Sequence, residues 1–117
     1  MDDDILIVFT HCPDSESAER LAHNLVESKL AACVNILAPC RSIYWWQGEV
    51  EQACEIPVQI KTTRLRYGAV ESSIRSQHPY TLPEIMAVSV AAGLAGYLDW
   101  IRQSVTAPQA SGMPGTP

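Results

Sequence analysis

The spacing of apolar residues in the first third of the chain predicts a strand, a helix and a second strand. The run Ile5–Phe9 is continuously apolar and has the length of a strand that is buried on both faces. Apolar residues then recur between positions 18 and 26 with the spacing of one helical face, and Asp14 or Ser15 can cap the start of this helix. Cys33–Leu37 has the composition of a second strand.

A long hairpin is predicted in the middle of the chain. Its first arm, Arg41–Trp46, is rich in β-branched and aromatic residues, and Gln47–Glu49 is a plausible turn. Its second arm, Glu49–Lys61, alternates between an apolar face and a polar face. An arm of this length extends on the order of 40 Å at about 3.3 Å per residue, so we expect the hairpin to project from a small domain. The apolar face carries Cys54, Ile56, Val58 and Ile60, and the other face carries Glu51, Glu55, Gln59 and Lys61.

Three more elements are predicted in the last third of the chain. Tyr67, Val70 and Ile74 share one face of a second helix. Glu84–Val90 predicts a further strand, and apolar residues between positions 94 and 105 predict a short final helix.

The resulting order, β-α-β-β-α-β with an added helix, is the ferredoxin-like order of an α+β fold. In this fold two helices pack on one face of an antiparallel sheet. We expect a single domain over residues 1–105. Residues 106–117 are rich in proline, glycine and small side chains, which predicts a disordered tail.

Charge and composition narrow the classes of function. A net charge of -5 argues against binding to nucleic acid or to an anionic membrane, and no apolar run approaches the length of a membrane span. The segment Met1–Asp4 is acidic where an export signal would be basic, which predicts a cytoplasmic protein. The four cysteines lack Cys-x-x-Cys spacing, so we expect small buried side chains rather than disulfides or a zinc site.

The hairpin carries three adjacent aromatic residues, Tyr44, Trp45 and Trp46. They are too apolar to be left in water on a projecting arm. Strand alternation sends Trp45 and Trp46 to opposite faces, so we interpret them as anchors of a subunit interface rather than as ligand-stacking groups. The hairpin is expected to pair with neighbouring subunits, most simply in a closed ring.

With these motifs in this order, the chain resembles the CutA family, also called divalent-cation tolerance proteins. The resemblance runs from about Ile5 to Ile101. Several separate motifs make it specific. The residues that carry it are Lys29-Leu30-Ala31-Ala32-Cys33-Val34-Asn35, Tyr44-Trp45-Trp46-Gln47-Gly48-Glu49, Ile60-Lys61-Thr62-Thr63 and His78-Pro79-Tyr80-x-x-Pro83-Glu84.

The resemblance implies a ferredoxin-like subunit in a tight homotrimer, whose hairpins join sheets between subunits as in the trimeric PII signalling proteins. It also implies a link to the tolerance of copper and other divalent cations. Some members are assigned three copper ligands, a cysteine at the end of the first strand and two consecutive histidines before the Pro-Tyr. Here Thr10 matches the cysteine and Gln77 the first histidine, so only His78 of that set is present.

A different soft metal site is conceivable from His78, His11 and Cys12, because imidazole and thiolate suit copper and zinc. His78 precedes Pro79 at a helix end, however, and can instead hydrogen-bond a carbonyl there. Cys12 lies at a helix start, where a buried structural role and a reactive thiol are both open.

A second candidate site groups Lys61, Tyr80 and Glu84 in a pocket between subunits. Lys61 can bind an anionic ligand there or pair with Glu84 across a subunit boundary, and Tyr80 can close the pocket. Glu49, Glu51 and Glu55 share strand parity; we interpret them as a solvated face that protects the sheet edge, with hard-cation binding as the alternative.

The function predicted from these features is a non-enzymatic trimer linked to copper and divalent-cation tolerance. A PII-like sensor of a small molecule or anion is the main alternative, and a module that presents loops to protein partners is another. An enzyme using Glu84, His78 or Lys61 ranks last, because no catalytic or cofactor-binding motif is visible.

Overall fold

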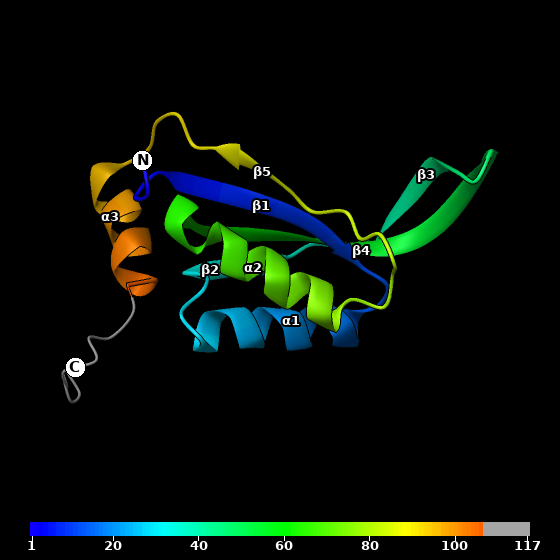
Figure 1. Cartoon of the computed structure of the whole chain (residues 1–117), viewed down its shortest axis with the longest axis horizontal. Coiled ribbons are helices and arrows are strands. Elements are labelled where there is room, and N and C mark those ends of the chain that lie inside the picture. Colours follow the sequence, from blue (N-terminus) through cyan, green and yellow to red (C-terminus); the bar gives the residue numbers. More distant parts are fainter. Residues whose placement is uncertain (107–117) are drawn as a thin grey trace.

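The computed structural model describes residues 1–106, so the predicted disordered tail lies outside the described residues except for Thr106. Five strands and three helices follow one another along this part of the chain (Figure 1). They are β1 (Ile5–Cys12), α1 (Ser15–Glu27), β2 (Cys33–Ile36), β3 (Cys40–Trp46), β4 (Glu49–Thr63), α2 (Arg64–Gln77), β5 (Met86–Ser89) and α3 (Ala95–Ser104).

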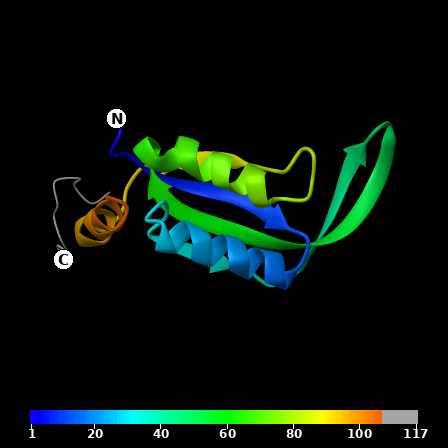
Figure 2. The same cartoon turned by 60° about the horizontal axis from the view of Figure 1, so that its bottom comes forward.

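The strands form one antiparallel sheet in the order β2-β4-β1-β5. The inner part of β4 lies between β1 and β2, with Thr63 opposite Ile5 and Ile56 opposite Cys12. Its outer part pairs with β3, from Glu55 to Glu49. Helices α1 and α2 cover the same face of the sheet (Figure 2). The predicted ferredoxin-like fold is confirmed.

The hydrophobic core lies between this face and the two helices. Every second residue of β1 and of inner β4 points inward, including Val8 and Ile60, and meets Leu25 of α1 and Ile74 of α2. Cys54 was predicted on this apolar face but is exposed. It lies on the outer part of β4, which extends beyond the helices.

The hairpin turns at Gln47 and Gly48, whose φ angles are 50° and 84°. Two consecutive positive φ angles are typical of the tight hairpin turns that match strand twist, and glycine adopts them without steric cost. The molecule measures 52 × 29 × 23 Å with a radius of gyration of 15.7 Å, above the about 13 Å expected for 100 compact residues. The predicted projecting hairpin is confirmed.

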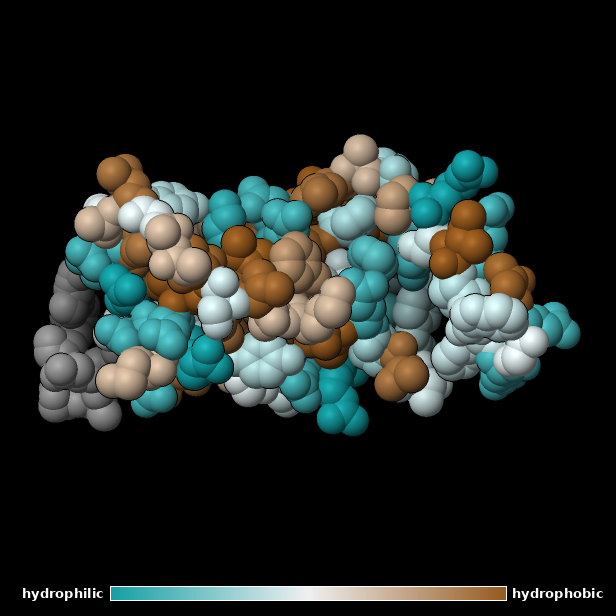
Figure 3. Space-filling view, turned by 90° about the horizontal axis from the view of Figure 1, so that it is seen from above, coloured by the Kyte–Doolittle hydropathy of each residue, from teal (hydrophilic) through white to brown (hydrophobic). Residues whose placement is uncertain are grey.

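Apart from its end near Lys61, which Tyr97 of α3 contacts, the opposite face of the sheet has no helical cover (Figures 1 and 2). Ile7 and Phe9 of β1 lie on this face. Their partners on β5, Val88 and Met86, are both exposed. Seen from above, apolar side chains gather over the sheet, and others lie on the projecting hairpin (Figure 3). Between residues 1 and 106, no helix is both long and apolar enough to cross a membrane.

Candidate functional site

A groove of about 760 Å³ lies where the hairpin leaves the body of the molecule. One wall is the hairpin, from Glu55 at its base to Trp46 beside its turn; the other is the segment after α2, with Tyr80 and Glu84. This segment crosses the end of β1 next to the hairpin base (Figures 1 and 2). The strand predicted at 84–90 therefore begins only at Met86, because Glu84 turns toward the groove instead of pairing in the sheet.

His11 is the centre of a charged cluster in this groove. Its Nδ1 atom lies 3.2 Å from Oε1 of Glu55 and 3.2 Å from Oε1 of Glu84. The sheet register explains the first contact, because His11 pairs with Pro57 and Glu55 lies two residues along β4, on the same face. One imidazole therefore links the hairpin base to the segment after α2.

Glu55 corrects the prediction of a solvated acidic face. Only 8% of Glu55 is exposed, whereas Glu49 and Glu51 are exposed as predicted. Sequence reasoning missed the cluster because its members are 29 to 73 residues apart and meet only through the antiparallel register and the return of the chain after α2. The only sign of the cluster in the sequence was that His11 and Glu84 each lie at the end of a predicted strand.

Tyr80 belongs to the same cluster. Burial, followed by the negative charge of Glu55 and a hydrogen bond to it, raises the pKa of the Tyr80 phenol. The phenol is therefore held as a neutral donor beside two carboxylates. The ring of Tyr80 also lies against that of His78, with centroids 4.6 Å apart.

Both ring nitrogens of His78 are engaged within the protein. Its Nε2 donates to the backbone carbonyl of His11, and its Nδ1 accepts the backbone N–H of Tyr80 at 3.2 Å. The backbone N–H of His78 also closes α2 by donating to Ile74. This arrangement matches the structural interpretation, in which His78 ends the helix and holds the following segment against β1.

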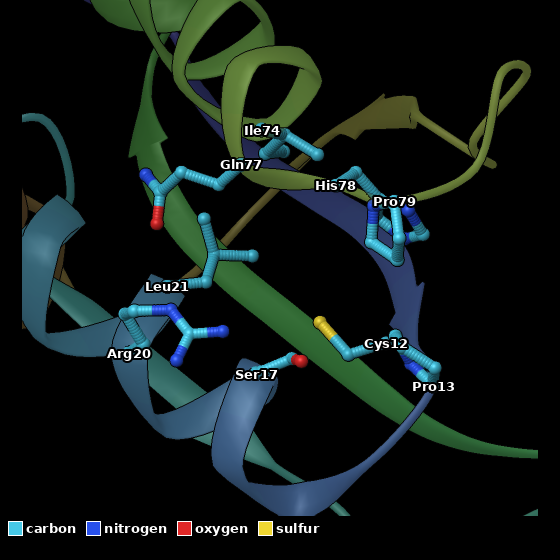
Figure 4. Close-up of a pocket in the computed structure, with 9 residues that line it drawn as sticks. All are labelled: Cys12, Pro13, Ser17, Arg20, Leu21, Ile74, Gln77, His78 and Pro79. Atoms are coloured by element: carbon cyan, nitrogen blue, oxygen red, sulfur yellow. The ribbon is translucent and has the colours of Figure 1, made fainter.

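Cys12 lies on the opposite face from His11, in a small cavity between α1 and the end of α2 (Figure 4). The volume of this cavity is about 10 Å³, enough for about one water molecule. Burial, and then the charge of Asp14, raises the pKa of the thiol to about 11. The thiol is thus protonated and shielded, although it lies at a helix start.

The residues predicted or implied as metal ligands do not fit a divalent cation within one subunit. His78 has no free nitrogen, and Cys12 and His11 point to opposite faces of β1. Thr10 is fully buried with an unpaired hydroxyl, and Gln77 is hydrogen-bonded to Asn24 and Ser73. Across residues 1–106, no three His, Cys, Asp or Glu side chains are arranged to hold a metal ion.

The proposed pocket residues divide into two places in the subunit. Tyr80 and Glu84 line the groove, but Lys61 does not. Lys61 pairs with Ile7, four residues before His11 on β1 and so about 13 Å from it along the strand. Its Nζ lies 3.2 Å from the Tyr97 hydroxyl and 5.6 Å from the centre of that ring, a contact that the sequence did not indicate.

The hairpin aromatics also separate by face. Tyr44 and Trp46 line the groove, whereas Trp45 is 74% exposed and does not. The predicted alternation of Trp45 and Trp46 is confirmed. Their role as interface anchors stays a prediction, since a single subunit does not test it.

Comparison with known proteins matches most of the described part of the chain to one family. The chain matches the family model described as "CutA1 divalent ion tolerance protein" over residues 6–104. It is 41% identical over 98 residues to the divalent-cation tolerance protein CutA of Archaeoglobus fulgidus, covering 84% of this chain and 95% of that protein. It is 40% identical to the human protein CutA over 95 residues, which cover 81% of this chain and 53% of the human one.

The solved structures agree with this match. The crystal structure of CutA from Xylella fastidiosa is similar with a TM-score of 0.86 at 42% sequence identity, covering 88% of this chain and 99% of that one. The resemblance inferred from the sequence motifs is therefore confirmed.

Two relatives correct the predicted location. A structure from Archaeoglobus fulgidus with a TM-score of 0.84, 39% identical and covering 87% of this chain and 99% of that one, is named a periplasmic divalent cation tolerance protein. A rice relative that is 35% identical, over 85% of this chain and 56% of its own length, is named chloroplastic. Relatives of one fold thus occur in different compartments, so the acidic Met1–Asp4 segment does not determine location, and the cytoplasmic prediction is wrong.

Proposed function

Because the chain belongs to the CutA1 divalent ion tolerance family, we propose that it acts in the tolerance of divalent cations, copper among them, as a non-enzymatic homotrimer. The observation that carries this proposal is the family match over residues 6–104 together with a relative's structure at a TM-score of 0.86. The bacterial and archaeal relatives are named for cation tolerance, and their names contain no reaction. This favours binding or assembly over catalysis.

Two exposed apolar surfaces support the homotrimer. One is the uncovered sheet face with Met86 and Val88, which are 59% and 49% exposed. The other is the hairpin, with Ile43 and Trp45 at 66% and 74%. Contiguous apolar surface of this kind marks an interface more often than a free surface, and a closed ring would cover both regions in every subunit.

The proposal does not include direct binding of copper by a single subunit. The predicted ligand set does not fit a divalent cation in one subunit, so direct copper binding would require ligands from more than one subunit or movement of His78. Tolerance through the assembled protein does not depend on such a site.

A growth experiment tests the proposal. Cells lacking the gene are grown with increasing copper, zinc and cobalt, with and without the gene supplied on a plasmid. We expect the gene to raise the inhibitory concentration of at least one of these ions. Equal growth at all concentrations, with the protein present at normal levels, would contradict a role in tolerance. Native mass spectrometry of the purified protein, with and without each ion, reads subunit number and bound metal separately.

A further inference from the structure

The sheet narrows where the hairpin leaves the body of the molecule. Pairing of β1 with β4 ends at Cys12 and Ile56, and pairing of β3 with β4 begins at Cys40 and Glu55. Toward Thr63, β4 lies between β1 and β2; toward the turn its partner within residues 1–106 is β3 alone. The hairpin turns away from the plane of the sheet at this point (Figures 1 and 2). It is therefore joined to the body through its own two chain segments and not through a ladder with β1.

The strand pairing also shifts register here. Residues 37–39 face residues 56–57 of β4, three residues against two, which is the count of a β-bulge. Pro39 and Pro57 lie on opposite sides of this break, and neither has an N–H for the ladder. A bulge bends the strand and disrupts the ladder locally. We refer to this break, residues 37–39 and 56–57, as the hairpin junction.

Glu55 carries the polar contacts that cross the hairpin junction. Among residues 1–106, every ion pair or side-chain hydrogen bond from the hairpin to the body ends on this carboxylate, from His11 of β1 at 3.2 Å and from Tyr80. His11 is itself held by Glu84, also at 3.2 Å, and by His78, which donates to its backbone carbonyl. These contacts join groups of one chain, so they do not depend on what covers the surface of the subunit.

We propose that the hairpin is an arm hinged at the hairpin junction and that His11 restrains its movement. The imidazole connects β1, β4 and the segment after α2, so the arm turns away from the body only if the contact between His11 and Glu55 is lost. Glu55 is 8% exposed, and a buried carboxylate that loses its partner is strongly unfavourable, which makes the observed position the stable one. The inference deepens the proposed function and rests on the homotrimer, because the position of the arm decides where it meets a neighbouring subunit.

Hydrogen exchange of the full protein, as it assembles in solution and followed by mass spectrometry, tests the restraint. His11→Leu removes the donor. It should speed exchange of the amides at 40–43 and 52–55 at least about tenfold, because the arm then leaves its observed position more often. The amides of α1 should exchange as in the wild type. His11→Asn keeps an N–H donor near the place of Nδ1 and should restore slow exchange.

His23→Leu is the matched control. His23 also lies near a carboxylate, that of Glu27 at 3.5 Å, but on α1 and outside the hairpin junction. Equal exchange at the hairpin in His11→Leu and His23→Leu, or a uniform increase throughout the His11→Leu subunit, would overturn the proposal. If His11→Leu does not fold, Tyr80→Phe, which removes only the hydroxyl that is hydrogen-bonded to Glu55, should give the same local increase. Unchanged exchange in that variant would also overturn the proposal.

Native mass spectrometry over a dilution series measures the consequence for assembly. We expect His11→Leu to dissociate into subunits at a concentration at least about tenfold higher than the wild type and His11→Asn. A His11→Leu trimer that dissociates at the wild-type concentration would overturn the positioning role. A wild-type protein that is a single subunit at every concentration would contradict the homotrimer but not the hinge, which the exchange rates test on their own.

Discussion

Two adjacent side chains at the end of β1 differ in their chemistry because alternation sends them to opposite faces of the sheet. Cys12 is 3% exposed, beneath α1 and the end of α2, and the pKa of its thiol is raised to about 11. The thiolate is the reactive form of cysteine, so burial removes both access and reactivity. His11, one residue earlier, faces the groove and two carboxylates.

The state of Cys12 gives a labelling prediction. Iodoacetamide at about pH 8.5 should modify exposed Cys54 and leave Cys12 unmodified in the folded protein, as read by peptide mass spectrometry, because a thiol with a pKa of about 11 is mainly protonated at that pH. In guanidinium chloride all four cysteines should react. Rapid labelling of Cys12 in the folded protein would show that the end of α2 opens.

At the scale of elements, the apolar pattern was sufficient to locate a helix or strand where one face of that element packs on the core. It located α1 and α2 and the inner half of β4, and it identified Asp14, which accepts the Ser17 N–H at 2.7 Å, as one of two candidate caps. It failed for Cys54, because alternation continues along β4 after the helices that cover it have ended.

The same logic explains the missed parts of the candidate site. Two of these features depend on segments that are distant in the sequence. The burial of Glu55 depends on the segment after α2, and the contact of Lys61 with Tyr97 depends on α3. Local periodicity carries no information about such contacts, since each depends on strand register and on how the chain returns. The sequence predicted Tyr80 and Glu84 as candidate pocket residues, but only the fold brought His11 between two carboxylates.

Helix α1 offers a direct measurement of this one-sided packing. Leu25 is fully buried, and the next residue, Val26, is 42% exposed. Leu25→Ala should lower the free energy of unfolding by about 2–5 kcal/mol because it leaves a cavity between helix and sheet. Val26→Ala should change it by less than about 0.5 kcal/mol, as expected for a surface position. Denaturant unfolding measures both, and similar losses would contradict the assignment of the core face.

On the scale of the whole molecule, the two layers of the fold leave most of one side of the sheet uncovered. Helices α1 and α2 shield one face and α3 contacts only an end of the other, where Met86 and Val88 stay exposed, and the hairpin extends beyond the body. A small chain with 47% hydrophobic residues can gain much of its burial from association, since its own surface is large relative to its core. The proposed homotrimer rests on this exposed apolar face.

A matched pair of charge substitutions tests whether this face is the interface. Val88→Glu places a carboxylate on the uncovered sheet face, beside Ile7; Val26→Glu places one on the outer side of α1 at similar exposure. Native mass spectrometry should show a trimer for Val26→Glu and mainly single subunits for Val88→Glu, because an unpaired charge inside an apolar interface is strongly unfavourable. Circular dichroism would verify that both variants keep their helices and strands. A stable trimer of the folded Val88→Glu variant would leave the hairpin as the surface that joins the subunits, and Trp45, 74% exposed, would become the next residue to change.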